Sequence, residues 1–398
     1  MGKIQDSTLS ESILPPKTLA QMEALNKEAA PLHIWLRTHA NAPQKQPWHF
    51  GLEEKPPELE KYPKSITSPP PIYRPAPYLW KWTDIEPYLH RIAEIAPLEF
   101  TDRQQFLLLN PSLDRSLSVT KTIRVALSIY KPGDEAINHM HSPNASRTIL
   151  SEFGGYTKVD GETCKAQRGD LILTPNGTWH SHGNKSKDPV IWMDVLDWPL
   201  LEYLDCIWIT EEDQSQMPNT PNHSKNYSSR HFGRGGMVPV FSSETRGIGH
   251  GNSPLMHYKG QDIRHTLEEL AGDEGDPFEA IKIKFTNPIN GSSVFTTLGY
   301  SAQLLRPRES TLPSRQTAST LYCCISGGGY TEVAGKRLEW GKNDIFIVPN
   351  HLWHHHANLD DRKNAILYAI TDAPLLQLIG HFRSQGKTKD GTLIDLNT

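Results

Sequence analysis

Four histidines stand in two pairs in the first half of the chain, and each pair has the same one-residue gap. His139 and His141 form the first pair, and His180 and His182 form the second. Both pairs lie in strand-like sequence, where side chains at positions i and i+2 point to the same face. If the two strands pack in one small barrel, the four imidazoles converge in its mouth. Neutral imidazole suits divalent Fe, Zn, Ni or Cu, and three imidazoles leave coordination positions open for chemistry.

Glycine, proline and asparagine recur at fixed distances from these histidines. The second pair stands in G-D-L-I-L-T-P-N-G-T-W-H-S-H-G-N, which begins at Gly169 and ends at Asn184, and Gly133 precedes the first pair by a short turn. A single histidine on a strand is more often a core or surface group, but two pairs in such a setting favour a metal centre. The ligands alone do not select the metal, because the general affinity order favours Cu²⁺ or Zn²⁺ over Fe²⁺.

Short apolar runs separated by turn residues surround the histidines. These runs predict strands over residues 106–109, 123–130, 147–150, 155–159, 171–174 and 190–196. Turn sequences with glycine and aspartate separate several of them, at Gly133, Gly161 and Gly169. This spacing predicts a β-sandwich or β-barrel. Arg147, six residues after His141, is expected to share its face if one regular strand continues between them.

A second β-rich block, over residues 281–370, repeats the first. Tyr156, Asp170, His180 and Asn184 match Tyr330, Asp344, His354 and Asn358, always 174 residues later. A run of matches at one offset indicates an internal duplication. The same offset carries His139 and His141 onto Pro313 and Arg315, so we expect the second barrel to be structural and without a catalytic metal.

Outside the two blocks, the composition changes. Residues 19–38 favour a helix, and a proline-rich stretch up to about residue 78 rules out regular structure and predicts an extended arm. Trp80, Trp82 and Leu89 open a short helical segment, and a further helix is expected over 263–271. The predicted division is an arm over 1–78, a metal-binding barrel over 79–212, a polar linker over 213–240, a degenerate barrel over 241–384 and a tail over 385–398.

The composition also excludes several classes of function. The 398 residues carry a net charge of −4 without a basic stripe, so nucleic acid is not an expected partner. No signal peptide and no apolar stretch of about 18 residues is visible, so no membrane association is expected. The four cysteines lack the spacing of a zinc ribbon and are interpreted as thiols in a reducing compartment, which favours the cytoplasm.

The glycine, proline and histidine spacings resemble the two motifs of the cupin superfamily. The wider chain, from about residue 80 to 380, resembles the bicupin gentisate 1,2-dioxygenases with their salicylate and 1-hydroxy-2-naphthoate relatives. The resemblance is carried by H-M-H-S-P-N-A-S-R, G-G-Y-T-K-V-D-G-E, T-W-H-S-H-G-N and V-I-W-M-D-V-L-D-W-P-L. It implies an all-β-dominated bicupin of two jelly-roll β-barrels, with an N-terminal helical and proline-rich arm.

The resemblance also assigns roles to residues. It implies one Fe²⁺ per chain in the N-terminal barrel, held by His139, His141 and His180. Catalytic roles fall on Arg147, His182 and Asp194, and substrate contacts fall on Arg147, Arg103, Asn144 and Trp179. The residues themselves leave simpler roles open: ion pairs for the two arginines and Asp194, packing for Trp179, and a hydrogen bond to the backbone or a ligand for His182.

The implied reaction is ring cleavage by an Fe(II)-dependent dioxygenase. O₂ is inserted into a hydroxylated aromatic acid of the gentisate type, between the carboxyl- and hydroxyl-bearing carbons, by a homo-oligomer, either a dimer or a tetramer. Ser146 and Thr148 replace larger apolar residues of the family beside Arg147 and are expected to widen the pocket or make it more polar. The alternatives are a dioxygenase acting on a bulkier phenolic or polyketide-derived aromatic in a biosynthetic pathway, and a non-catalytic cupin that binds a metal or small molecule.

Overall fold

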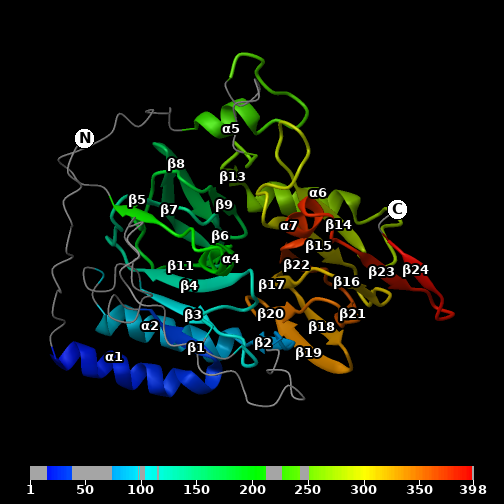
Figure 1. Ribbon diagram of the computed structural model, residues 1–398, viewed down its shortest axis with the longest axis horizontal. Coiled ribbons are helices and arrows are strands. Elements are labelled where there is room, and N and C mark those ends of the chain that lie inside the picture. Colours follow the sequence, from blue (N-terminus) through cyan, green and yellow to red (C-terminus); the bar gives the residue numbers. More distant parts are fainter. Residues whose placement is uncertain are drawn as a thin grey trace, which may run out of the picture.

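Two β-rich halves lie side by side in the computed structural model, which describes residues 16–37, 74–96, 98, 104–113, 116–211, 226–242 and 251–396 (Figure 1). Each half consists of two antiparallel sheets. The prediction of two jelly-roll units is therefore confirmed, although the sheets face each other as open layers rather than closed barrels.

The first half contains a seven-stranded sheet and a five-stranded sheet. In spatial order the first sheet is β1 (Ile34–Leu36), β3 (Gln105–Leu108), β4 (Arg124–Tyr130), β11 (Val190–Leu196), β6 (Ala145–Ile149), β9 (Leu171–Thr174) and β13 (His257–Tyr258). The second is β12 (Ile209–Glu211), β5 (His139–His141), β10 (His180–Gly183), β7 (Phe153–Val159) and β8 (Glu162–Gln167). Both histidine pairs thus lie on adjacent strands of the smaller sheet.

The second half contains two six-stranded sheets. One is β14 (Ile281–Phe285), β15 (Gly299–Leu305), β22 (Ala365–Thr371), β17 (Thr320–Ser326), β20 (Ile345–Val348) and β2 (Tyr78–Trp80). The other is β19 (Lys336–Gly341), β18 (Gly328–Val333), β21 (His354–Asn358), β16 (Ser314–Gln316), β23 (Ser384–Lys387) and β24 (Leu393–Asp395).

The alternation of side chains along each strand separates the inside of a half from the core that joins the two halves. On β11, Ile191, Met193 and Val195 belong to the large shared core, whereas Trp192 belongs to a smaller cluster inside the first half. The shared core includes residues of both halves and of α1 (Pro16–Ala29) and α2 (Trp82–Ile95). The halves are therefore packed into one body by their outer faces.

The halves also exchange strands. β2 pairs with β20 of the second half, while β13 pairs with β9 of the first. The helices that follow, α2 and α6 (Gly260–Leu270), begin beside matching aspartates: Trp82 N donates to Asp344 Oδ1 at 2.7 Å, and Gly260 N donates to Asp170 Oδ1 at 2.8 Å. The expected domain boundaries stay a prediction, and these exchanged elements cross them.

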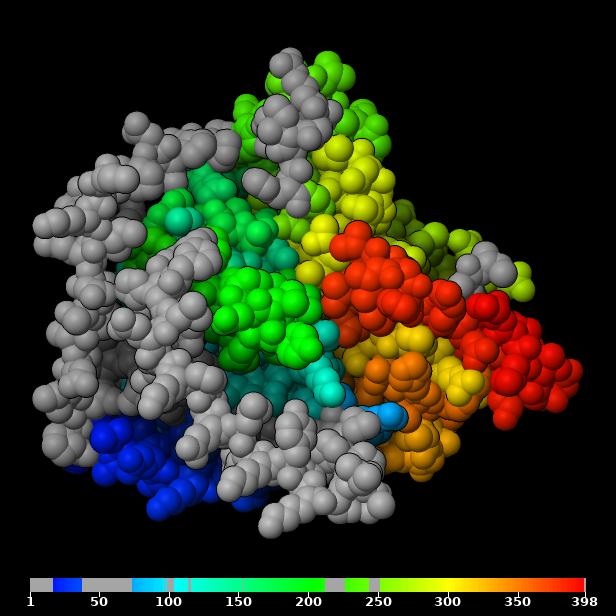
Figure 2. All heavy atoms as spheres, in the orientation of Figure 1, coloured from blue at the N-terminus to red at the C-terminus, as the bar shows by residue number. Residues whose placement is uncertain are grey.

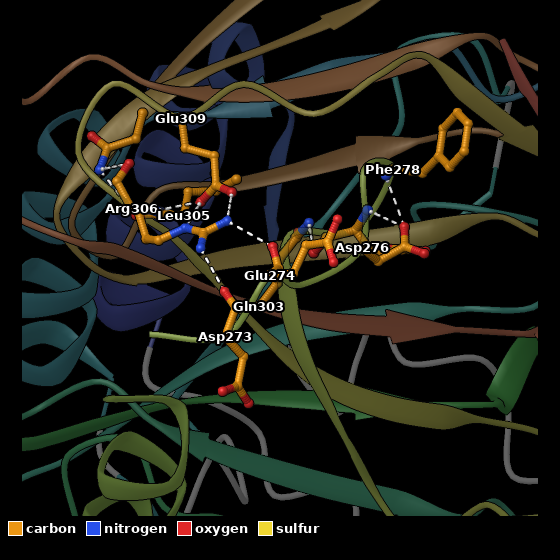
Figure 3. A network of polar contacts seen from close by, with 10 residues as sticks. Asp273, Glu274, Asp276, Phe278, Gln303, Leu305, Arg306 and Glu309 are labelled. Carbon is orange, nitrogen blue, oxygen red and sulfur yellow. Dashed lines mark hydrogen bonds and ion pairs between the residues drawn. The ribbon is translucent and has the colours of Figure 1, made fainter. Parts of the chain in front are cut away.

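The duplication extends to individual turns. In the first half Lys131 N donates to Asp134 Oδ2 at 2.8 Å, and in the second Arg306 N donates to Glu309 Oε2 at 2.7 Å. Around Arg306 the copy has gained contacts, because its guanidinium also donates to the Asp273 and Glu274 carbonyl oxygens (Figure 3). These turns are 175 residues apart, and the offset returns to 174 only between β7 and β10, because two hairpins differ in length by one residue.

The N-terminal segment differs from its predicted form. The helix α1 ends at Ala29, a 3-10 turn follows over Ala30–Leu32, and Ile34–Leu36 pairs with β3 as a strand. Trp35 is therefore a strand residue and does not belong to a helix extending to residue 38. The proline-rich arm lies mostly outside the described residues.

The remaining helices are short. They are α4 (Trp198–Tyr203), α5 (Tyr227–Phe232) and α7 (Ala373–Leu378). α5 lies within the predicted linker, most of whose first half falls outside the described residues, and the predicted tail contributes to β23 and β24. Of the helices in the described segments, none combines the length and apolar character needed to cross a membrane.

Candidate metal centre

His139, His141 and His180 come together inside the first half. His139 on β5 lies directly opposite His180 on β10, and their ring centroids are 4.2 Å apart. The His141 ring lies 4.7 Å from the His180 ring. One ligand atom from each histidine lies within 4.8 Å of the others, so a single ion can be shared by all three. The pairing of two antiparallel strands at this register is what brings the two sequence pairs together.

Backbone carbonyl groups fix the tautomer of all three rings. The Nδ1 atoms of His139, His141 and His180 lie 2.9, 2.7 and 2.9 Å from the carbonyl oxygens of Ile137, Pro143 and Thr178. A carbonyl oxygen only accepts, so each Nδ1 carries the proton and each Nε2 keeps its lone pair. Metal-binding histidines show this arrangement, in which the second ring nitrogen is held by a carbonyl or carboxylate group. The residues present therefore fit a divalent metal ion.

His182 lies beside the three candidate ligands but has a different partner. Its ring centroid is 5.4 Å from that of His180 and 6.0 Å from that of His139. Its Nδ1 lies 3.2 Å from Thr157 Oγ1 on the neighbouring strand β7. A hydroxyl group can donate or accept, so this contact orients the ring without fixing its tautomer. His182 is placed next to the metal centre, and its catalytic role stays a prediction.

Arg147 and Asp194 form a buried ion pair on the facing sheet. Arg147 on β6 lies opposite Asp194 on β11, and Nε is 3.0 Å from Oδ1. Asp194 Oδ2 accepts hydrogen bonds from Ser128 Oγ at 2.6 Å and Trp192 Nε1 at 3.0 Å. The Trp192 ring lies 5.9 Å from that of His182, which links the ion pair to the histidines. The ion pair alternative and a role in the site are therefore compatible.

The strand that was expected to place Arg147 is interrupted. β5 ends at His141 and β6 begins at Ala145 in the other sheet, so Arg147 does not share a strand face with His141. The side chains of Ser146 and Thr148 point away from Arg147, because neighbouring residues alternate across a strand. They lie opposite Val195 and Met193 of the shared core. The expectation that they reshape the pocket beside Arg147 is therefore wrong.

The three other predicted substrate contacts have different outcomes. Asn144 is buried and its side chain binds Asp197, Thr297 and Asn176. Trp179 is half-buried, and its backbone N donates to Asp160 Oδ1 at 2.9 Å. Arg103 lies outside the described residues. For all three, contact with substrate stays a prediction.

Residues that the sequence gave no reason to select also line this interior. Ser128 and Thr174 contact Asp194 and Arg147, and Gln105 Nε2 donates to Ser128 Oγ at 2.9 Å. Their signal is their position in the alternation: each stands on the inward face of a strand in which the outward residues are apolar. A polar residue at an inward position of an apolar strand was the available indication.

The second half keeps only part of the histidine set. His354 lies opposite Ser314, as His180 lies opposite His139, so the residues that replace His139 and His141 are Ser314 and Gln316. Pro313 and Arg315 were wrong by one position, because the offset is 175 in this region. The interior is filled by aromatic rings: Tyr322 stacks on Phe346 at 5.0 Å and lies 4.7 Å from the His356 ring. Burial lowers the pKa of His354, and lowers that of His356 well below its ordinary value.

Comparison with known proteins identifies the class. The model of the family described as "Cupin domain" matches residues 126–196, which include all four site histidines. A 5-aminosalicylate 1,2-dioxygenase from Comamonas sp. is 35% identical over 83% of this chain and 87% of the relative. A gentisate 1,2-dioxygenase from Ralstonia sp. is 30% identical over 79% and 86% of the two chains. A mutant of salicylate 1,2-dioxygenase from Pseudoaminobacter salicylatoxidans, solved in complex with gentisate, has a TM-score of 0.72 and 26% identity over 80% and 88% of the chains.

The protein is thus a cupin whose metal-type site lies in the first of two duplicated sandwiches. More narrowly, the chain belongs to the gentisate 1,2-dioxygenase family of ring-cleaving dioxygenases.

Proposed function

We propose that this protein is an iron(II) dioxygenase that cleaves the ring of a 2-hydroxybenzoate with an electron-donating group at position 5. Gentisate and 5-aminosalicylate, which name the similar relatives, share this pattern of a carboxylate, an ortho hydroxyl group and a para donor. The carrying observation is the set of three imidazoles whose Nδ1 atoms donate to backbone carbonyl oxygens. His139, His141 and His180 would hold one Fe²⁺ per chain through Nε2. A ferrous ion bound there supplies a positive centre with open positions for the substrate oxygens and O₂.

Arg147 is proposed to bind and orient the substrate. A guanidinium group presents parallel N–H donors that match a carboxylate or phenolate. Asp194 holds the Nε side of that group, and Thr174 Oγ1 lies 3.2 Å from Nη1, so the guanidinium plane is fixed before substrate arrives. Such preorganisation reduces the entropy lost when the ring is placed for reaction.

His182 is proposed to hold or transfer a proton at its Nε2 atom. It lies beside the three candidate ligands and keeps a hydroxyl group, that of Thr157, on its other nitrogen. Histidine suits this role because its ordinary pKa is near neutrality. Trp192 packs on the ring of His182 and excludes water from one side of it.

The setting of the enzyme is also proposed. We place it in the cytoplasm as a homo-oligomer, either a dimer or a tetramer. All four cysteines lie in the described residues as free thiols, three of them buried, which supports a reducing compartment.

Oxygen uptake tests the proposal directly. Fe²⁺-loaded protein should consume one O₂ per molecule of gentisate or 5-aminosalicylate and produce a ring-opened product with a new near-ultraviolet absorbance. Salicylate and 1-hydroxy-2-naphthoate serve as comparison substrates that lack the para donor. Absence of uptake with all four acids, in protein shown to contain iron, would contradict the proposed reaction.

A further inference from the structure

The two halves interlock through matching threonines and aspartates. Thr297, just before β15 in the second half, donates to Asp197 Oδ2 of the first half at 2.5 Å. Thr122, just before β4 in the first half, donates to Asp372 Oδ2 of the second half at 2.6 Å. Asp197 immediately precedes α4 and Asp372 immediately precedes α7, so the duplication places the same contact on both sides of the boundary. In Figure 2 the green atoms around α4 lie beside the orange and red atoms of the second half.

Only one of these two contacts leads to metal ligands. Asp197 accepts from Asn144 at both carboxylate oxygens: backbone N to Oδ1 at 2.8 Å and Nδ2 to Oδ2 at 2.9 Å. Asn144 ends the turn that follows His141, and the preceding residue, Pro143, supplies the carbonyl oxygen that binds His141 Nδ1 at 2.7 Å. The second half therefore holds the turn that orients His141.

Asn144 holds the turn before His180 as well. Its Oδ1 accepts from Asn176 N at 3.0 Å and from Asn252 Nδ2 at 3.0 Å. The turn that contains Asn176 also contains Thr178, whose carbonyl oxygen binds His180 Nδ1. Asn252 Nδ2 lies 2.8 Å from Asn176 Oδ1 too, so two residues of the second half, Thr297 and Asn252, bracket both turns.

The copy in the second half shows the same contact without this connection. Ser319 stands in place of Asn144, and its backbone N donates to Asp372 Oδ1 at 2.8 Å. Ser319 Oγ accepts from Asn350 N at 3.2 Å, as Asn144 Oδ1 accepts from Asn176 N. Serine lacks the amide donor by which Asn144 reaches Asp197 and Thr297. The half with three histidines thus has an additional bridge where the half without them has none.

We propose that Thr297 and Asn252 are positioning residues for the metal centre, through which the second half holds the His141 and His180 turns of the first by way of Asp197 and Asn144. This inference rests on the proposed metal site. It gives the degenerate half a part in activity that a purely structural role lacks. Groups that orient metal ligands through a second contact typically change metal affinity by 10- to 100-fold when removed.

The test compares matched threonines. In Thr297→Val the dissociation constant for Fe²⁺ should rise by about tenfold or more, and the visible spectrum of bound Co²⁺ should change because the ligand geometry changes. Thr122→Val removes the equivalent contact and should show a similar loss in thermal stability but wild-type metal affinity and Co²⁺ spectrum. Thr297→Ser keeps the hydroxyl group and should restore both metal properties.

The outcomes separate the inference from the proposed function. If the wild-type protein binds neither metal, the proposed metal site itself fails. If the wild-type protein binds both and Thr297→Val matches Thr122→Val in affinity and spectrum, the site stands and the positioning role is overturned. Should Thr297→Val not fold, Asn252→Ala decides by the same two readouts, because Asn252 is only half-buried and contacts Asn144 from the same half.

Discussion

Arg147 and Asp194 lie opposite each other on neighbouring strands, and both side chains are almost completely buried, with Nε 3.0 Å from Oδ1. A buried charge whose partner is removed retains its desolvation cost without compensation. The pair therefore connects the stability of the first half with the orientation of a residue proposed to bind substrate.

Removal of the carboxylate should be strongly destabilising. We expect Asp194→Leu to lower the free energy of unfolding by about 3–5 kcal/mol, because it leaves the Arg147 guanidinium buried and unpaired. Chemical denaturation measures this change. The double variant Arg147→Met with Asp194→Leu should recover most of the loss. Glu268→Gln breaks an exposed i,i+4 pair with Arg264 and should cost less than about 1 kcal/mol. Equal effects of the buried and exposed changes would refute the importance of burial.

A conservative change at Arg147 should affect catalysis more than metal binding. Arg147→Lys keeps the charge beside Asp194 but loses the planar fork, so kcat/KM should fall by about 10- to 100-fold, in line with about 1.5–3 kcal/mol for a hydrogen bond to a charged group. Iron content should remain that of the wild-type protein, and Arg147→Ala should behave likewise with a larger loss. Full turnover in the lysine variant would remove Arg147 from substrate binding.

Acidification should weaken the second half through its buried histidines. Burial keeps the pKa of His356 far below its ordinary value, so the unfolded chain takes up a proton below about pH 6.5 that the folded protein does not. The unfolded state then binds more protons, and the free energy of unfolding falls as the pH falls, by at most about 1.4 kcal/mol per pH unit for this group.

The slope, rather than the absolute stability, identifies His356 as the cause. Denaturation at several values between pH 7 and pH 5 should give a shallower dependence for His356→Leu than for the wild-type protein. Tyr322→Phe alters a ring that touches His356 without adding or removing a group that titrates in this range, and should keep the wild-type slope. An unchanged slope in His356→Leu would assign the pH dependence to other groups.

The sequence predicted the local parts of the site well, because strand periodicity is a local property. The strands over 171–174 and 190–196 were found at their predicted limits, and both histidine pairs lie on strands as their spacing indicated. The three-histidine cluster follows from these two facts and from the duplication.

What the sequence could not give depends on contacts between distant residues. Thr297 and Asp197 are 100 residues apart, and β2 pairs with a strand more than 260 residues later, so no local pattern reports either contact. The one-residue change in offset had a similar origin. Hairpin length changes without altering the strands beside it, and a match at 174 in one region does not carry to Ser314.

Equilibrium dialysis of the purified protein against Fe²⁺ without oxygen tests the central claim most directly. We predict one tightly bound iron per chain in the wild-type protein and in His354→Ala, and none in His139→Ala or His180→Ala. Two irons per wild-type chain, or retention of iron in His180→Ala, would contradict a single centre formed by the histidines of β5 and β10.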